Sequence, residues 1–83
     1  METMEIRRIK LGDNITEIDY NKGRILISYK TPVDYYDYDK TQYFKTSKFW
    51  SRTTSKHINK WVGFNTAEEI DQDKLDHMFG LGL

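Results

Sequence analysis

The sequence predicts an α+β fold in which an antiparallel sheet of four or five strands is followed by two C-terminal helices. Three observations predict it. The chain has 83 residues and one proline, residues 4–46 hold short β-branched and aromatic runs between turn signals, and helix caps appear only after residue 50. Strands that precede helices favour a sheet with the helices packed on one face. A chain of this length fits a single domain over residues 1–83.

Three strands are expected in the first third of the chain. A run of mixed pattern at residues 4–11 precedes the turn signal Gly12-Asp13-Asn14. Residues 15–20 and 24–30 then flank Asn21-Lys22-Gly23, a hairpin loop in which the glycine can adopt the positive φ of a tight turn. These runs predict three consecutive antiparallel strands.

A second hairpin is expected to complete the sheet. Residues 33–38 and 42–46 are rich in aromatic and β-branched side chains and surround the loop Asp39-Lys40-Thr41. Pro32 precedes them and has no N–H group for a strand ladder. We therefore expect Pro32 at a strand start or at an edge.

The first helix is expected over residues 53–62. Residues 51–55 offer several hydroxyl side chains that can accept a hydrogen bond from a free helix N–H group. Gly63 suits the position that follows a helix C-terminus. One face of this helix is expected to pack on the sheet, with residues at helical spacing: Thr54, Ile58, Trp61 and Val62.

The second helix is expected over residues 67–79. Thr66 and Glu69 have the spacing of a capping box, in which each side chain accepts from a backbone N–H group of the first turn. Acidic residues near this start also suit the positive end of the helix dipole. The segment is therefore predicted to be helical from its first residues.

Composition excludes several classes of protein. The chain has 13 basic and 13 acidic residues and no cysteine, which argues against a disulfide scaffold, a thiolate zinc site and a strongly charged mimic of DNA. It contains no apolar run of about 20 residues and no signal-peptide pattern at the start. We expect a cytoplasmic protein of a bacterial host cell with no membrane partner. Its small core leaves a homo-oligomer open.

No residue pattern predicts catalysis, a metal or a cofactor. Asp73 and His77 share a helical i, i+4 spacing, but two ligands do not make a metal site. Thr53 and His57 have the same spacing, yet hydroxyl caps and a histidine on a helix face account for these residues without catalysis. We expect a protein that is not an enzyme.

Residues 40–64 form a basic-aromatic segment with six basic residues and no acid. Cations that pair with phosphates and rings that stack on bases are typical of nucleic-acid or nucleotide binding. The alternative is that the rings form the core and the cations form its solvated rim. The candidate nucleic-acid or phosphate residues are Lys45, Lys48, Arg52, Thr54, Lys56 and Lys60, with Trp50 or Tyr43 as stacking rings.

An acidic-tyrosine run at residues 34–39 is the other unusual segment. Its tyrosines either pack on the sheet with the aspartates in water, or form a protein-contact surface, since tyrosine is enriched at interfaces. Acidic residues of the last helix are expected to extend that surface. The candidate protein-contact residues are Tyr35, Tyr36, Asp37, Tyr38, Glu68, Glu69 and Asp73.

Residues 49–62 carry a motif that resembles a family of small proteins of unknown function from phages and plasmids. The family pattern runs Trp-Ser-x-Thr-Thr-Ser-x-His-Ile-Asn-x-Trp-Leu, and Thr31-Pro32-Val33 and Tyr43-Phe44-Lys45-Thr46 are similar to its preceding strands. The likeness covers about residues 24–62 and departs from the pattern at Asp34 and Val62. It implies an origin on a mobile element and no particular activity.

Two functions follow as hypotheses. The first is a small phage-type accessory protein that binds a macromolecule and inhibits or modulates a host or defence protein through the acidic-tyrosine run. The second is a nucleic-acid or nucleotide binding module that uses residues 40–64.

Overall fold

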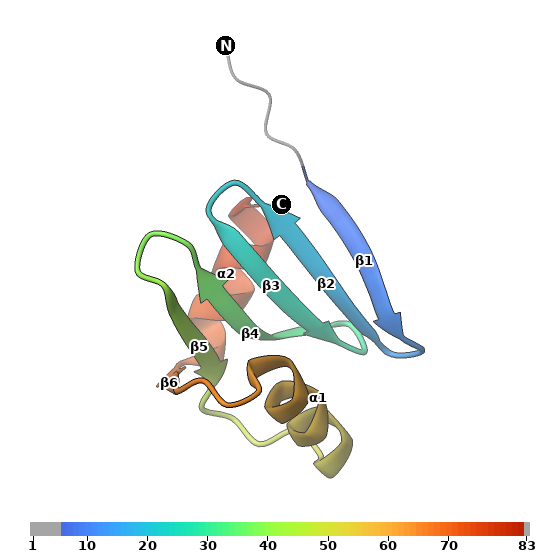
Figure 1. Ribbon diagram of the computed structural model, residues 1–83. Coiled ribbons are helices and arrows are strands. Elements are labelled where there is room, and N and C mark those ends of the chain that lie inside the picture. Colours follow the sequence, from blue (N-terminus) through green and yellow to red (C-terminus); the bar gives the residue numbers. More distant parts are fainter. Residues whose placement is uncertain (1–5, 83) are drawn as a thin grey trace.

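The computed structural model describes residues 6–82 and shows an α+β fold with a six-stranded sheet and two helices (Figure 1). Residues 4 and 5 of the predicted first strand lie outside the described residues. The strands follow one another in the sheet in sequence order. They are β1 (Arg7–Gly12), β2 (Ile15–Tyr20), β3 (Gly23–Ser28), β4 (Thr31–Asp37), β5 (Gln42–Thr46) and β6 (Ala67–Ile70), and the helices are α1 (Arg52–Val62) and α2 (Gln72–Gly82).

The first five strands form the predicted antiparallel hairpins, and β6 adds a sixth strand parallel to β5. The chain reaches this parallel position by crossing through α1, as a parallel pair requires a long connection. Pro32 lies in β4 opposite a register shift between Leu26 and Ile27, which agrees with its expected place near a strand start. The fold class is confirmed, and the sheet is mixed.

The start of the predicted second helix is wrong. Residues 67–70 form β6, and α2 begins only at Gln72. Tertiary contacts outweigh the capping-box pattern at Thr66 and Glu69. The edge of β5 offers hydrogen bonds to residues 67–70, and the apolar residues at the two ends of β6 pack against the two core clusters. Ala67 packs on the cluster beneath α1, while Ile70 packs on the cluster beneath α2. A local propensity is a weak prior against such burial.

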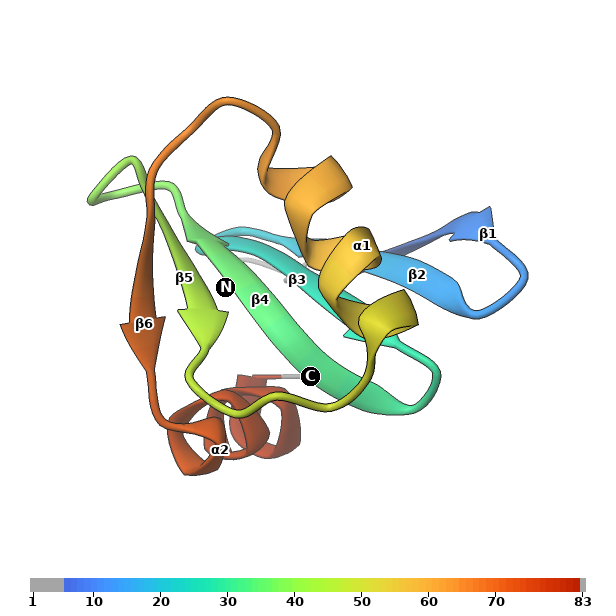
Figure 2. The ribbon, with the colours of Figure 1, turned by 90° about the horizontal axis from the view of Figure 1, so that it is seen from below.

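The helices cover opposite faces of the sheet, contrary to the expectation of one shared face (Figure 2). The cause lies in β3, where the consecutive residues Ile25, Leu26 and Ile27 are 1%, 0% and 7% exposed. Successive strand residues point to opposite faces, so a strand buried at every position needs cover on both sides. Leu26 packs toward α1, whereas Ile25 and Ile27 pack toward α2.

Helix α1 forms for the predicted reasons. The Ser51 hydroxyl accepts a hydrogen bond from the Thr54 amide at 3.1 Å, and Gly63 ends the helix with φ of 67°. The predicted inward face is correct, since Thr54, Ile58 and Val62 are buried and Trp61 packs against the same cluster.

Gly23 has a different role from the predicted one. Its φ is not in the positive range, so the turn Asn21-Lys22 does not depend on it. A Cβ at this position would collide with the carbonyl oxygen of Tyr36 and lie 2.7 Å from the Tyr35 ring. Glycine is needed here because β4 approaches β3 too closely for a side chain.

Candidate binding groove

A groove of about 530 Å³ opens between α2 and the sheet. Strands β4, β5 and β6 and helix α2 supply apolar side chains to it, and charged side chains surround them. Concave apolar sites with a few convergent polar groups are the usual form of ligand and partner sites. The α2 groove, as we call it, is lined by Tyr35, Asp37, Lys40, Phe44, Ile70, Asp73, Lys74, His77 and Met78.

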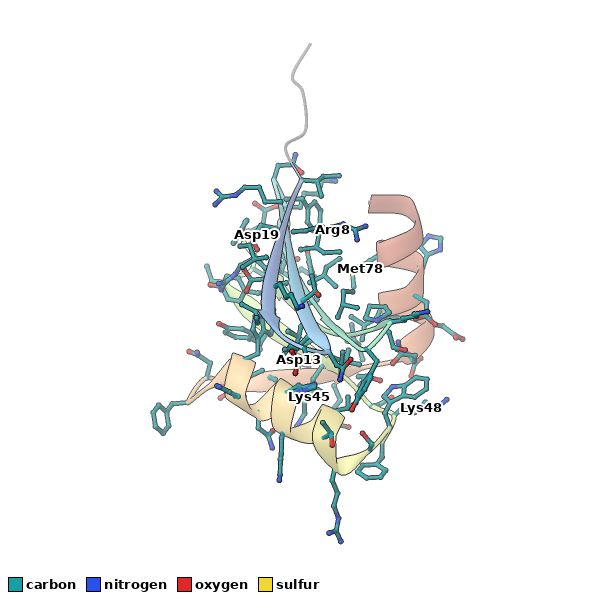
Figure 3. The ribbon with its side chains drawn as sticks, turned by 90° about the vertical axis from the view of Figure 1, so that its right-hand side faces the viewer. Arg8, Asp13, Asp19, Lys45, Lys48 and Met78 are labelled. Carbon is teal, nitrogen blue, oxygen red and sulfur yellow. The ribbon has the colours of Figure 1, made fainter. Side chains whose placement is uncertain are left out.

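The sheet positions the apolar part of the α2 groove. Tyr35 and Phe44 are directly opposite in the β4–β5 ladder, and their rings are stacked with centroids 6.3 Å apart. Burial raises the pKa of Tyr35, and its hydroxyl donates a long hydrogen bond of 3.4 Å to the Lys22 carbonyl. Met78 extends from α2 toward the sheet (Figure 3). These contacts fix the rings at the base of the groove.

The charged rim has both signs. Asp37 accepts backbone hydrogen bonds from Asp39 at 2.9 Å and from Lys40 at 3.0 Å, which shapes the β4–β5 turn. The Lys40 ammonium lies 5.7 Å from the Phe44 ring centroid. Across the groove, Asp73 and Lys74 project from the first turns of α2. The apolar base of the groove is therefore surrounded by charges of both signs.

Gln72 holds the start of α2, and sequence reasoning missed it. Its amide nitrogen donates to the Pro32 carbonyl at 2.7 Å, and its amide oxygen accepts from the Trp50 indole at 3.0 Å. A single polar residue at the first position of a helix has no local signal for such long-range partners. The groove depends on it because it joins α2 to β4.

The structure separates the predicted protein-contact residues. Strand alternation directs Tyr35 toward α2, whereas Tyr36 packs on the α1 side. Three of the seven residues line the α2 groove: Tyr35, Asp37 and Asp73. The other four lie elsewhere, on the α1 side or on the exposed edge strand β6: Tyr36, Tyr38, Glu68 and Glu69. The seven residues therefore do not form one surface.

Comparison with protein families identifies the family of this chain. The model of a family of unknown function, DUF8033, matches residues 4–77, which include all six strands and most of α2. The chain belongs to the DUF8033 family. Comparison with curated proteins and with solved structures gives no match.

The α1 side of this DUF8033 protein carries a packed aromatic cluster around Arg24. The Arg24 guanidinium lies 4.9 Å from the Tyr36 ring centroid and 5.7 Å from that of Trp61. Tyr43 lies between these two rings, at 4.5 Å from Tyr36 and 5.5 Å from Trp61. Tyr36 and Tyr43, each predicted to contact a partner, are therefore engaged within the protein.

Two carboxyl groups lie beside this cluster and were missed by sequence reasoning. Trp61 donates a hydrogen bond of 2.7 Å from its indole to Glu17. Burial, together with the neighbouring Glu17 carboxyl, raises the pKa of Asp19 to about 6, against the opposing charges of Arg24 and Arg7. Asp19 lies on the opposite side of the sheet from α2 (Figure 3). The i, i+2 spacing of the acids in β2 is the only local sign of this pair.

The predicted nucleic-acid residues divide in two. Thr54 is buried and bonded to Ser28, so it is not free for a phosphate, whereas Lys45 is half-buried on β5, where it lies in register between Asp34 and Glu69. The remaining cations are exposed on or before α1: Lys48, Arg52, Lys56 and Lys60.

The two tryptophans also differ. Trp61 is packed, as predicted for a residue that anchors residues 40–64, whereas Trp50 is 41% exposed and carries the Lys48 ammonium 4.0 Å above its ring. Phe49 is 71% exposed. The alternative interpretation, in which the rings of residues 40–64 form the core, is wrong for Phe49 and Trp50 in the loop before α1 and for Phe64 in the loop after it, because all three are exposed.

Histidine His57 pairs with Ser28 rather than with Thr53. The Ser28 hydroxyl lies 2.9 Å from His57 Nδ1 and is 2% exposed. A nucleophile must be reachable by its substrate, and the Ser28 hydroxyl is buried, so its contact with His57 anchors α1 to β3. Residues 6–82 contain no group of three metal-ligating side chains and no helix long and apolar enough to cross a membrane.

Proposed function

We propose that this DUF8033 protein acts by binding another protein, which inserts apolar side chains into the α2 groove. One observation carries the proposal: the fold leaves an apolar hollow of about 530 Å³ between α2 and the sheet, with four charged residues around it. Tyrosine, phenylalanine and methionine at its base are the residue types that interfaces favour.

A protein partner fits the α2 groove better than a nucleic acid does. The rim contains two acids, Asp37 and Asp73, and two cations, Lys40 and Lys74. Their charges cancel, so the rim has no net positive potential that would attract a polyanion. Mixed charge around an apolar centre is instead the usual anatomy of a protein interface.

We further propose that the partner is a host or defence protein in the cytoplasm of a bacterium, which this small phage-type accessory protein inhibits or modulates. The motif at residues 49–62 supports this, because it resembles proteins carried by phages and plasmids. The absence of cysteine is compatible with a reducing compartment.

Capture from a bacterial lysate tests the groove. Asp73→Lys should abolish retention of a protein that the wild type captures, because it places an excess positive charge beside the apolar base. Glu69→Lys makes the same charge change on an exposed residue outside the groove and should leave capture intact. Thermal unfolding by circular dichroism checks that both variants fold. Equal retention by wild type and Asp73→Lys would contradict the proposal.

A second function is favoured by the exposed rings before α1. Phe49 and Trp50 are accessible beside Lys48, Arg52 and Lys56, so a single strand of nucleic acid could stack on them while its phosphates meet the cations. Titration with an oligonucleotide should quench Trp50 in a Trp61→Phe variant, with an affinity that falls steeply with salt. An unchanged signal at low salt would exclude this function.

A further inference from the structure

A second cavity of about 530 Å³ lies on the α1 side, between the β1–β2 turn and α1. None of its residues lines the α2 groove. Asp13 marks its position at the hairpin end that faces α1 (Figure 3). The hairpin pocket, as we call it, is lined by Leu11, Gly12, Asp13, Asn14, Ile15, His57, Lys60 and Trp61.

A chain of hydroxyl groups sets the tautomer of His57. The Ser51 hydroxyl donates to Thr54 Oγ1 at 3.2 Å, and Thr54 Oγ1 lies 3.0 Å from Ser28 Oγ. Thr54 is buried, so its one O–H needs an acceptor, and Ser28 fills that role because the Ser51 hydroxyl already donates to Thr54. The Ser28 hydroxyl is then free to donate its own hydrogen bond to His57 Nδ1, which lies 2.9 Å away. Because Nδ1 accepts, the ring proton of neutral His57 resides on Nε2.

This tautomer gives the hairpin pocket a donor for an anion. The Nδ1 edge of His57 is occupied by Ser28, so the Nε2–H edge is the one left for a ligand in the cavity. Lys60, one turn further along α1, lines the same cavity and adds a positive charge. An N–H donor beside an ammonium group is suited to a phosphate group.

The other walls suit a ring that carries an amino group. Leu11, Ile15 and Trp61 provide apolar and aromatic surface. Asp13 is acidic and would repel the phosphate, but its carboxylate can accept from the exocyclic amine of a base at the other end of the ligand. The pocket thus receives a cation from α1, an acid from the β1–β2 turn and apolar surface from residues of α1 and the β1–β2 hairpin.

We propose that the hairpin pocket binds a nucleoside monophosphate whose base has an exocyclic amine, with the phosphate at His57 and Lys60 and the amine at Asp13. Such a group occurs as a free nucleotide or at the 5′ end of a strand. This site lies on the face of the sheet opposite to the α2 groove. A test of nucleotide binding is therefore independent of a test of the proposed protein partner.

Fluorescence of Trp61 in a Trp50→Phe background tests the site directly. Addition of adenosine monophosphate should change the signal and saturate, whereas inosine monophosphate, which lacks the amine, should bind at least about 5-fold more weakly. Asp13→Asn should remove this preference. A 5′-phosphorylated oligonucleotide that binds more tightly than the free nucleotide would identify a strand end as the source.

Matched lysine variants separate the pocket from general attraction. Lys60→Met should weaken binding of adenosine monophosphate at least about 10-fold, because the phosphate loses its cation. Lys56→Met removes an exposed cation one turn away, outside the pocket, and should leave binding unchanged. Equal losses in the two variants, or no saturation by about 10 mM nucleotide, would overturn the proposal.

The histidine provides a readout that does not depend on ligand affinity. Nitrogen chemical shifts of His57 should report the Nε2–H tautomer in the free protein, and Ser28→Ala should shift its tautomer balance. Nucleotide should perturb Nε2 more than Nδ1. A free protein with its proton on Nδ1 would remove the donor on which the site depends.

Discussion

The two faces of the sheet are held by different kinds of contact. On the α1 side, polar groups pair across the interface, with Trp61 bonded to Glu17 at 2.7 Å and Ser28 to His57 at 2.9 Å. On the α2 side, Leu75 is the buried apolar residue of the described part of the helix, Gln72 ties its start, and a groove remains open. One face therefore specifies where its helix lies, and the other leaves apolar surface open in a groove.

This difference separates stability from binding. Satisfied buried polar pairs are sensitive to the loss of either partner, so changes on the α1 side should alter the fold. A groove with an exposed rim contributes little to folding, so changes there should alter contacts with other molecules. The following expectations are ordered by the size of the effect on stability.

Leu75→Ala and Ile58→Ala should each destabilise the protein by about 3 kcal/mol, yet in different ways. Leu75 holds α2 to the core of Ile25, Ile27 and Tyr35, so its truncation should release α2 while the rest stays folded. Ile58 belongs to the core of Leu26 and Val33, so its truncation should lower global stability. Hydrogen exchange measures the contrast. Loss of protection only in α2 is expected for Leu75→Ala, and uniform loss in both variants would contradict it.

Asp34→Asn should gain about 2 kcal/mol of stability relative to the wild type as pH rises from 6 to 8. Asp34 is fully buried on β4, and burial raises its pKa from 3.8 to about 8. Between these values the folded state keeps a proton that the unfolded state has lost, so stability falls as pH rises.

Urea unfolding near pH 4 and near pH 8 measures this effect. Wild type and Asp34→Asn should converge in acid and diverge in base. The raised pKa of Asp19 adds a slope of the same sign only up to about pH 6, so the interval from 6 to 8 isolates Asp34. Parallel curves across that interval would refute the assignment.

Trp61→Phe should cost about 1.5 kcal/mol, because the Glu17 carboxyl loses the indole donor in a place with little water. Trp50→Phe removes a similar indole bond, to Gln72, at an exposed site and should cost less than about 0.5 kcal/mol. Chemical denaturation of the two variants compares them directly. Equal costs would show that burial on the α1 side does not strengthen the bond.

Lys74→Ala should leave stability within about 0.5 kcal/mol of the wild type, since this residue is exposed at the rim of the α2 groove. Thermal unfolding checks this. A larger loss would mean that the rim supports the fold, and the separation of stability from binding would then fail.

Part of the architecture could be read from the sequence, because short-range chemistry decides it. The strands at residues 15–20 and 42–46 have the predicted bounds, and the Ser51 cap and Gly63 end define α1. Residues 67–70 show the limit. Their capping-box pattern is helical, yet pairing with β5 and burial of Ile70 outweigh a preference worth a few tenths of a kcal/mol per residue.

Only some residues of the α2 groove were predicted from the sequence. Tyr35, Asp37 and Asp73 were selected as contact residues, but they were expected beside Tyr36 and Tyr38, which the pleat places on the α1 side. The Ser28–His57 pair and the Glu17–Trp61 pair join residues that are 29 and 44 positions apart. No local pattern connects residues at such separations.

The sequence by itself determined the α+β class, the hairpins and the first helix, since turn residues, caps and apolar spacing act over a few neighbouring residues. Only the tertiary structure decided that Ile25, Leu26 and Ile27 are buried on both sides, that the helices therefore take opposite faces, and that a groove and a pocket remain. Burial is a property of the whole chain, because a side chain leaves water only when distant segments cover it.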